Sequence, residues 1–347
     1  MKVPSAEDQL VFIQKIQRLF EDGNFSATYK YALLISLADL AVEKGNDDGE
    51  ELAISMREIA LKFAELYWPQ TVPYSSGTKA GLLFQNRSTQ AEIVTHLHGL
   101  RNSGADSLVK AENSASWEHV ISRIAATIRG MPVKHLQNLD GRLDPFLYDY
   151  PIRENSLVLR PGAGFLLRRF HGLIHQLSKS GWITHVRQNS LNAPIIGKSD
   201  DLESFMFGSY RESLAEIAKI LDPIQAGTCF YCGGRIREKV DVDHFIPWIK
   251  YPRDLAHNFV LTHASCNRSK SDMLGAKAHL EKWLRRNDKY GEELSGKLGK
   301  LGLISNADSI LTVAEWAYRQ GVNAGAHAWL EKKVTEPIDQ GYLALLT

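Results

Sequence analysis

The chain has 347 residues, enough for two or three domains, and its apolar fraction of 44% and charged fraction of 23% exclude a disordered or fibrous protein. The formal net charge of +1 excludes a strong overall attraction to nucleic acid, so binding of a polyanion would depend on local patches. The first residues do not resemble a secretory signal, and no run of about 18 apolar residues predicts a membrane span. We therefore expect a cytoplasmic protein that does not bind a membrane.

The N-terminal part of the chain, residues 1–139, is predicted to be a helical domain. Apolar side chains recur there at helical spacing, and helices are expected at residues 8–20, 29–42, 52–67, 90–99 and 116–128. The second of these helices is strongly apolar, which indicates that it is buried. Lys30 in its first turn reaches either a ligand phosphate or water. No motif assigns this domain a function, and we expect it to serve recognition or regulation.

Two further regions are also predicted to be mostly helical. Residues 140–226 are expected to form a β-hairpin and two helices, at residues 146–148 with 157–159, and at 165–188 and 202–220. Residues 274–347 are expected to form a helical C-terminal region, with helices at residues 274–287 and 310–333. Three tryptophans are expected to pack these last helices down: Trp283, Trp316 and Trp329.

Residues 151–190 are basic, with six Lys or Arg residues against a single Glu, a net +5. Arg168 and Arg169 in this segment are candidates for contacts with a phosphate backbone. A solvated helix face carries similar charge without any such function, so both interpretations stay open. His171 and His175 stand one helical turn apart, where two imidazoles could share an ion. The segment lacks the glutamate of a zinc-protease helix, and we interpret them as packing or surface residues.

The three cysteines of the chain lie close together in the sequence. Cys229-x-x-Cys232 and His263-x-x-Cys266 each bring two ligands onto one turn, and together they can close a tetrahedron around Zn²⁺. Gly233–Gly234 supplies the permissive backbone that such a turn needs. Four protein ligands predict a structural site, whereas an odd number of cysteines argues against disulfides. The alternative is that the cysteines are buried apolar residues and that the histidine is a surface side chain.

Between the two ligand pairs, the sequence predicts two strands and a helix. Residues 239–247 alternate as a strand does, and they contain Asp243 followed by His244. A loop then leads to residues 257–261, predicted as the second strand, and residues 266–270 open a helix. Polar side chains that can take part in catalysis or bind a metal lie at each junction of this β-β-α order.

This segment resembles the His-Asn-His (HNH) endonucleases, whose ββα-metal motif runs Asp-His, Asn and then Cys-Asn-x-x-Lys. The resemblance covers residues 227–273 and rests on the zinc clip, Asp-His-x-x-Pro from Asp243, the central Asn258 and Cys-Asn-x-x-Lys from Cys266. It implies a mostly α-helical protein with a small α+β module. A helical N-terminal domain would precede the ββα-metal nuclease module, and a helical C-terminal tail would follow it.

The resemblance implies a role for each matching residue. Asp243 and Asn267 would hold a catalytic divalent ion, Mg²⁺ or Mn²⁺, and His244 would be the general base. Asn258 would orient the His244 ring, and Lys270 would lie near a phosphate. Further candidates for phosphate contacts are Arg253 and Arg268.

These residue types suit phosphodiester hydrolysis, which needs an activated water and stabilised charge on the phosphoryl oxygens. A neutral imidazole accepts a proton near pH 7. Many family members carry histidine at the position of Asn267, and the neutral oxygen of asparagine suits a hard ion such as Mg²⁺. The alternative is that Asp243 and Asn258 cap turns and that His244 is a half-buried strand residue.

The expected function is therefore an endonuclease, with double-stranded DNA as the expected substrate. Residues 24–34 are similar to the N-terminal part of some bacterial HNH proteins, which suggests recognition or regulation, and the layout of the family points to defence or restriction. Two other functions remain open: a non-catalytic, zinc-stabilised nucleic-acid-binding protein, and an interaction protein in which only the helices matter. A homodimer or an activating partner is also left open.

Overall fold

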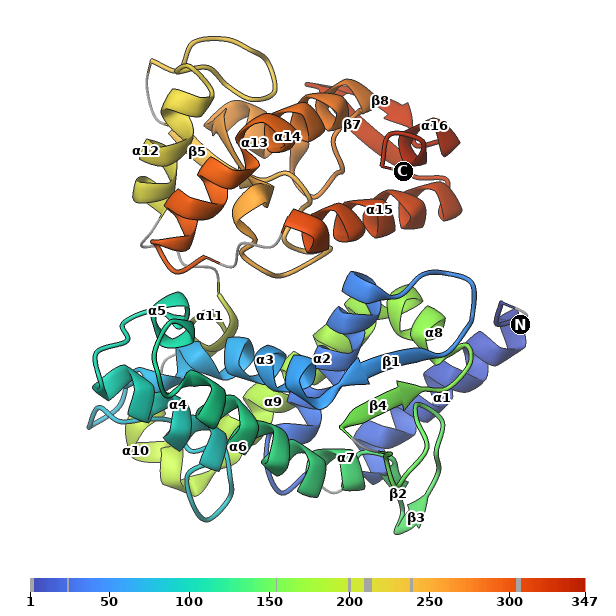
Figure 1. Ribbon diagram of the computed structural model, residues 1–347, viewed down its shortest axis with the longest axis vertical. Helices are drawn as coiled ribbons and strands as arrows, with labels where there is room; N and C mark the ends of the chain where they lie inside the picture. The colour runs from blue at the N-terminus through green and yellow to red at the C-terminus, as the bar shows by residue number, and fades with distance from the viewer. Residues whose placement is uncertain are drawn as a thin grey trace. The chain divides into compact units, whose positions relative to one another are not determined.

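The computed structural model describes residues 3–23, 25–153, 155–198, 201–208, 214–237, 240–303 and 307–346. The chain forms two compact units, Met1–Gly208 and Ser209–Thr347, and each is described by itself (Figure 1). Both units are mostly helical, and the sheets consist of two antiparallel strands each. The predicted fold class, mostly α with a small α+β module, is confirmed. The domain boundaries at residues 139, 226 and 273 stay predictions.

Helices make up most of the N-terminal unit. They are α1 (Ala6–Asp22), α2 (Tyr29–Lys44), α3 (Met56–Tyr67), α4 (Glu92–Asn102), α5 (Leu108–Glu112), α6 (Trp117–Gly130), α7 (Pro132–His135), α8 (Ala163–Arg169), α9 (His171–Gln188), α10 (Ala193–Ile196) and α11 (Leu202–Phe207). The strands are β1 (Leu52–Ser55), β2 (Asn138–Leu139), β3 (Arg142–Leu143) and β4 (Ser156–Leu159). Among the described residues of the whole chain, no helix combines the length and apolar character that crossing a membrane requires.

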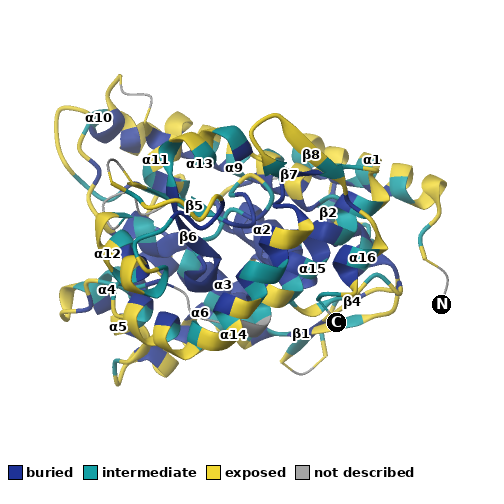
Figure 2. Ribbon diagram, turned by 90° about the horizontal axis from the view of Figure 1, so that it is seen from above, coloured by how far each residue is buried: buried dark blue, intermediate teal, exposed yellow. Residues whose placement is uncertain are grey.

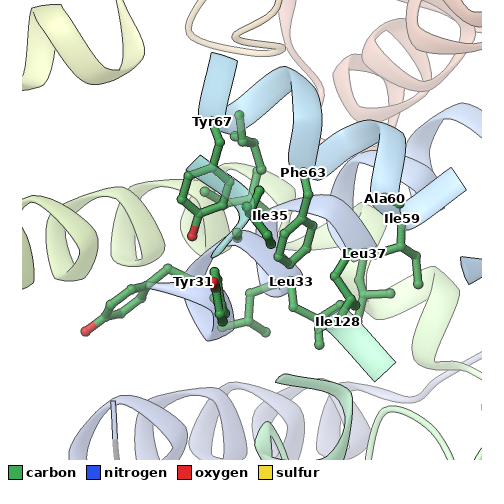
Figure 3. Close-up of a cluster of buried hydrophobic side chains, with 14 of the residues drawn as sticks. Tyr31, Leu33, Ile35, Leu37, Ile59, Ala60, Phe63, Tyr67 and Ile128 are labelled. Atoms are coloured by element: carbon green, nitrogen blue, oxygen red, sulfur yellow. The ribbon is translucent and has the colours of Figure 1, made fainter. Parts of the chain in front are cut away.

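Helix α2 lies at the centre of the N-terminal unit. All of its residues from Tyr29 to Val42 are buried, because a helix that is apolar on nearly all sides is stable only when its surface is covered. Helices α3, α8 and α9 pack on it, and Figure 2 shows it among the buried segments. In Figure 3, Leu33 and Leu37 of α2 lie near Phe63 of α3 and Ile128 of α6. The prediction of a buried helix at residues 29–42 is confirmed.

The sheet of β1 and β4 joins segments more than a hundred residues apart in the sequence. The hairpin predicted between residues 146–148 and 157–159 is therefore wrong, because β4 takes β1 as its partner. Tyr148 keeps an isolated bridge to Leu159. The helix predicted at residues 52–67 is confirmed only over α3, since its first four residues form β1.

Two other predicted helices are interrupted. The helix expected at residues 165–188 is present as α8 and α9, which meet at Phe170. The helix expected at residues 202–220 runs through residues 209–213, which lie outside the described residues, and α11 and α12 (Leu214–Ile224) flank them.

The C-terminal unit contains the cysteine-bearing module. Its further elements are β5 (Val240–His244), β6 (Phe259–His263), α13 (Ala264–Lys270), α14 (Lys277–Gly299), α15 (Ala307–Asn323), β7 (His327–Glu331), β8 (Val334–Pro337) and α16 (Gln340–Leu343). The helix predicted at residues 310–333 is wrong in its last part. The helix α15 ends before Gly325, whose φ of 60° departs from helical geometry, and β7 and β8 form a hairpin there.

Three buried tryptophans pack the C-terminal elements together, as predicted: Trp283, Trp316 and Trp329. The indole N–H of Trp283 on α14 donates to the carbonyl oxygen of His257 at 3.0 Å. The indole N–H of Trp329 on β7 donates to the hydroxyl of Ser269 on α13 at 3.1 Å. These bonds fix α14 to the segment between the two ligand pairs, and β7 to α13.

Candidate active site and metal centre

The predicted β-β-α order is present in the C-terminal unit. Strand β5 pairs antiparallel with β6, so that Asp243 lies opposite Val260 and His244 opposite Phe259. Helix α13 follows β6 without a loop and packs on both strands. Strand β5 begins at Val240, and the residue predicted to start it, Lys239, lies outside the described residues.

Four ligand side chains come together beside this motif, and we name them the four-ligand cluster: Cys229, Cys232, His263 and Cys266. Their ligand atoms all lie within 4.8 Å of one another. Nδ1 of His263 is 3.3 Å from Sγ of Cys232, while its Nε2 is 3.3 Å from the carbonyl oxygen of Arg235. A ring nitrogen that bonds to a carbonyl group carries the proton, so the other nitrogen is left with its lone pair for an ion. The donor set and this tautomer fit a zinc ion.

The first ligand pair lies on a tight turn. The N–H of Gly233 donates to the carbonyl oxygen of Cys229 at 3.0 Å, and the N–H of Cys229 donates to that of Gly234 at 2.9 Å. Gly233 has a φ of 71°, in the left-handed region that a residue without Cβ adopts at little cost. The sequence prediction that Gly233–Gly234 permits this turn is confirmed at Gly233.

The charges of the three thiols conflict within the four-ligand cluster. Burial opposes ionisation of Cys229, but hydrogen bonds from Thr262 and from backbone N–H groups outweigh it and lower the pKa to about 6. Burial and then the neighbouring thiols Cys229 and Cys232 raise the pKa of Cys266 to about 12. Like charges so close together disfavour one another. A divalent cation would remove this conflict.

His244 stands at the end of β5 with one ring nitrogen held by a carboxylate. Its Nε2 lies 2.8 Å from Oδ1 of Asp254, and the ring packs against Phe259 and Trp248 at centroid distances of 4.7 and 5.2 Å. Because a carboxylate only accepts, Nε2 carries the proton and Nδ1 keeps the lone pair. Among the described residues, Nδ1 forms no hydrogen bond. This arrangement can accept a proton from water.

Asp243 is held by two neighbours through a single oxygen atom. Oδ2 accepts a hydrogen bond from the hydroxyl of Tyr231 at 2.6 Å and lies 3.0 Å from Nζ of Lys270. Nζ of Lys270 also donates to the carbonyl oxygen of His244 at 3.1 Å. Within the described part of the chain, Oδ1 of Asp243 has no hydrogen-bond partner. One carboxylate oxygen is therefore left for an ion.

The structure corrects the predicted position of Lys270. The sequence resemblance implied a lysine near a phosphate, yet this side chain is fully buried and its ammonium group lies between Asp243 and the backbone of His244. In this arrangement the ammonium group of Lys270 does not reach a phosphate group of a bound substrate. It fixes the end of β5 and balances the charge of Asp243.

Asn258 is buried and contacts the backbone that follows His244. Its Oδ1 accepts from the N–H of Ile246 at 2.7 Å, and its Nδ2 donates to the carbonyl oxygen of Ile246 at 2.9 Å. The predicted contact with the His244 ring is therefore replaced by a contact with the turn after it. The ring itself is held by Asp254.

Asn267 lies next to a carboxylate that the sequence analysis did not single out. Its Nδ2 is 3.3 Å from Oδ2 of Asp241. Alternate residues of a strand share one face, so Asp241 and Asp243 lie on the same side of β5. The alternation Val-Asp-Val-Asp in the sequence carried this signal. Asp254 and Tyr231 were also missed as site residues, because nothing in their local sequence shows which side chain they meet.

Arg168, a predicted contact of nucleic acid, is instead buried in the N-terminal unit. Its Nη1 donates to the carbonyl oxygens of Ala41, Val42 and Gly45 at 3.2, 2.9 and 2.8 Å, and its Nε pairs with Asp47 at 2.8 Å. The carbonyl groups at the end of a helix have no partner within it and attract a cation. Arg168 therefore caps α2, and the prediction is wrong.

The other predicted phosphate contacts remain accessible to different degrees. Arg169 and Arg268 are exposed, and Arg253 is half-buried. These three residues stay candidates for contacts with nucleic acid.

The N-terminal unit holds a second cluster of metal-ligand side chains, which we name the buried triad: Asp39 on α2 with His171 and His175 on α9. The Nε2 atoms of His171 and His175 lie 2.8 and 2.7 Å from Oδ1 of Asp39. Burial lowers the pKa of His175 to about 3, so this imidazole is neutral at neutral pH. Both histidines lie in the interior, which agrees with the packing role considered from the sequence.

Two family models match the chain. A domain of unknown function, DUF8808, matches residues 11–192, and the HNH endonuclease family matches residues 229–276. The second match confirms the resemblance to HNH endonucleases and covers both ligand pairs and the β-β-α motif. No curated protein and no solved structure matches the chain.

Proposed function

Since the chain belongs to the DUF8808 family and carries an HNH endonuclease module, we propose that it is a metal-dependent endonuclease that hydrolyses phosphodiester bonds in DNA. One observation carries this proposal. The imidazole of His244, next to Asp243 at the end of β5, is bonded through Nε2 to Asp254 and keeps Nδ1 unbonded among the described residues. The tautomer that this contact favours leaves the lone pair of Nδ1 to accept a proton, as a general base requires.

In the proposed reaction His244 accepts a proton from water at Nδ1. The carboxylate of Asp254 fixes the tautomer of the ring and stabilises the positive charge that the ring then gains. Asn258 fixes the turn after His244 through both of its hydrogen bonds to Ile246. Lys270 acts as a positioning residue, because it joins Asp243 to the backbone of His244.

Asp243 at the end of β5 and Asn267 on α13 would hold a hard divalent ion, Mg²⁺ or Mn²⁺. Asp243 and Asn267 each keep a side-chain oxygen that accepts no hydrogen bond from the described residues, and oxygen ligands are what such ions prefer. Asp241, beside Asn267, would add a second carboxylate to this set. A divalent ion bound there would stabilise negative charge on the phosphate and on the leaving oxygen.

We propose that the four-ligand cluster binds Zn²⁺ as a scaffold and takes no part in the chemistry. The support is its complete set of four protein ligands, which leaves no position open for water or substrate. The cluster joins the turn at Cys229 to the start of α13, and so it fixes both ends of the segment that carries His244.

The proposed substrate is double-stranded DNA, and the proposed context is bacterial defence or restriction. The support is the resemblance of the sequence and the exposed positive charges of Arg169 and Arg268. A lower phage plaque count on bacteria that express the protein than on bacteria that do not would support the defence context. Equal counts with and without expression would refute it.

The direct test is incubation of the purified protein with plasmid DNA and Mg²⁺ or Mn²⁺, beside a control with EDTA. The proposal predicts cutting with the divalent ion and none with EDTA. Binding to DNA without cutting under any divalent ion would favour the non-catalytic nucleic-acid-binding protein instead. Asp254→Asn should lower the cutting rate about 10²-fold or more while zinc content stays unchanged, because asparagine favours the wrong tautomer of His244.

A further inference from the structure

The N-terminal unit contains a pocket of about 410 Å³ at the start of α2. It is lined by residues of α2, of the segment before it, and of α7 and β2, among them Ser26, Lys30, Met131, His135 and Asn138. A pocket of several hundred Å³ is in the range that small organic ligands occupy. The nuclease site in the other unit makes no use of it.

Lys30 lines this pocket and has no carboxylate partner among the described residues. Only 8% of its surface is exposed, and its one contact of note is with the ring of Phe25, 5.3 Å from the ammonium nitrogen. Burial lowers the pKa of Lys30 to about 8. A buried charge without a counterion destabilises a protein, so such a residue is unusual unless a ligand completes it.

Lys62 provides a comparison within the same unit. It is also 8% exposed, but its ammonium group lies 2.8 Å from a carboxylate oxygen of Glu43 and 3.2 Å from one of Glu65. The fold thus supplies carboxylate partners for Lys62 and, within the part of the chain that the structure describes, none for Lys30. Asp22, which contributes a carboxylate to the pocket lining, pairs with Arg18 at 3.1 Å.

The first turn of α2 adds to the positive potential at the pocket. A helix N-terminus carries unbonded N–H groups and partial positive charge, and an anion stabilises it. The first turn of α2 contains no acidic residue. Thr28, which precedes the helix, does not cap it with its side chain, because its hydroxyl lies 2.6 Å from that of Tyr67. Lys30 and the N-terminus of α2 therefore both favour an anionic ligand.

Two further polar groups face the same space. Burial, and then the charges of Lys134 and Lys30, lower the pKa of His135, so this side chain favours its neutral form. Oδ1 of Asn138 is buried and accepts no hydrogen bond in the structure. The pocket lining therefore offers an anion the ammonium group of Lys30 and the N–H groups at the start of α2.

We propose that this pocket binds the phosphate monoester of a small organic molecule, with Lys30 and the N-terminus of α2 holding the phosphate. Inorganic phosphate alone would leave most of the volume unfilled, so an organic part must contact the lining around Met131 and Asn138. The phosphate would come either from a nucleotide-sized metabolite or from the 5′ end of a nucleic acid.

The test is thermal unfolding and calorimetric titration of the full-length protein with inorganic phosphate, ribose 5-phosphate, adenosine 5′-monophosphate and adenosine. A phosphorylated probe at about 100 times its Kd should raise Tm of the N-terminal unit by roughly 5–10 °C, and adenosine should not. A 5′-phosphorylated oligonucleotide beside its unphosphorylated form separates the two sources of phosphate. No response to any phosphorylated probe would overturn the proposal.

Two matched variants separate ligand binding from folding. Without ligand, the Lys30→Met variant should fold with an equal or higher Tm, because the substitution removes an unpaired buried charge. Its affinity for the phosphorylated probe should fall at least about tenfold. Lys62→Met should lower Tm, because it removes the ammonium group that lies between the carboxylates of Glu43 and Glu65, and should bind the probe as the parent does. Equal affinity of the Lys30→Met variant and the parent would overturn the proposal.

Discussion

The two clusters of metal-ligand side chains differ in how their charges fit together. In the four-ligand cluster, three thiols and an imidazole converge, and the ionisation of Cys229 opposes that of Cys266. In the buried triad, two imidazole N–H groups meet one carboxylate oxygen, so donors and acceptor are complementary. A cation would relieve the repulsion in the first cluster, whereas the Nε2 donors and the carboxylate acceptor of the second are complementary without one, although Nδ1 of His175 is buried and has no hydrogen-bond partner among the described residues.

This difference shows that residue types alone do not identify a metal site. Histidines one helical turn apart with a nearby aspartate have the composition of a metal site, and so do two cysteine-containing pairs. What separates them is whether the ligand atoms repel or neutralise one another without an ion. The comparison predicts that metal removal acts on the C-terminal unit and leaves the N-terminal unit unchanged.

Loss of zinc should have the largest effect on stability. A structural zinc ion contributes roughly 10–16 kcal/mol in zinc-finger peptides, so Cys266→Ser or prolonged treatment with a strong chelator should unfold the module around β5 and β6. Hydrogen exchange followed by mass spectrometry would show fast exchange there and unchanged exchange in α2 and α9. A chelator that accelerates exchange in α9 instead would break the comparison, because it would make the buried triad a metal site.

Removal of the shared acceptor in the buried triad should have the next largest effect. Asp39→Ala removes the acceptor that two buried imidazole N–H groups share, and we expect the N-terminal unit to lose roughly 2–5 kcal/mol. Asp39→Asn keeps an oxygen at that position and should cost less. Urea unfolding measures both, with zinc content as the control. Equal stability of the parent and Asp39→Ala would contradict the assigned hydrogen bonds.

Acid should destabilise the buried triad in a defined range. The pKa of His175 is about 3 in the folded protein and 6.5 in the unfolded chain, because burial opposes its charge. The unfolded chain therefore binds the proton first, and the stabilisation present above pH 6.5 is lost as the pH falls toward 3. His175→Gln should flatten this dependence in urea unfolding of the N-terminal unit. An identical pH profile in that variant would assign the acid sensitivity to other groups.

The smallest effect is expected for exposed cations. If Arg268 in the C-terminal unit contacts a DNA phosphate, Arg268→Ala should reduce the slope of log K against log salt by about 0.9. If Arg169 in the N-terminal unit contacts a phosphate, Arg169→Ala should reduce the slope by the same amount. Filter binding at several salt concentrations would show which unit contacts the DNA backbone. Unchanged slopes in both variants would exclude both contacts.

Local patterns in the sequence were sufficient for the elements whose cause is local. Helix α2 follows from its apolar composition, and the four-ligand cluster from the spacing of Cys229, Cys232, His263 and Cys266. The order of β5, β6 and α13 follows from alternation and from the position of each motif.

Features that depend on distant partners could not be predicted in the same way. The pairing of β1 with β4 spans more than a hundred residues. The helical spacing of apolar residues continued into the segment that forms the hairpin of β7 and β8. Lys270 and Arg168 have the sequence context of exposed cations, yet each is buried against an acceptor from another element. Asp254 became a site residue only when the fold brought it to His244.

The most direct test of the nuclease account is the single-turnover cutting rate of His244→Ala beside that of His327→Ala, an exposed histidine on β7 that serves as a matched control. Zinc content and hydrogen exchange are measured in the same samples. We predict that His244→Ala cuts at least about 10²-fold more slowly, with zinc and fold retained, and that His327→Ala cuts like the parent. Equal rates for the two variants and the parent would contradict the role of His244 as the general base.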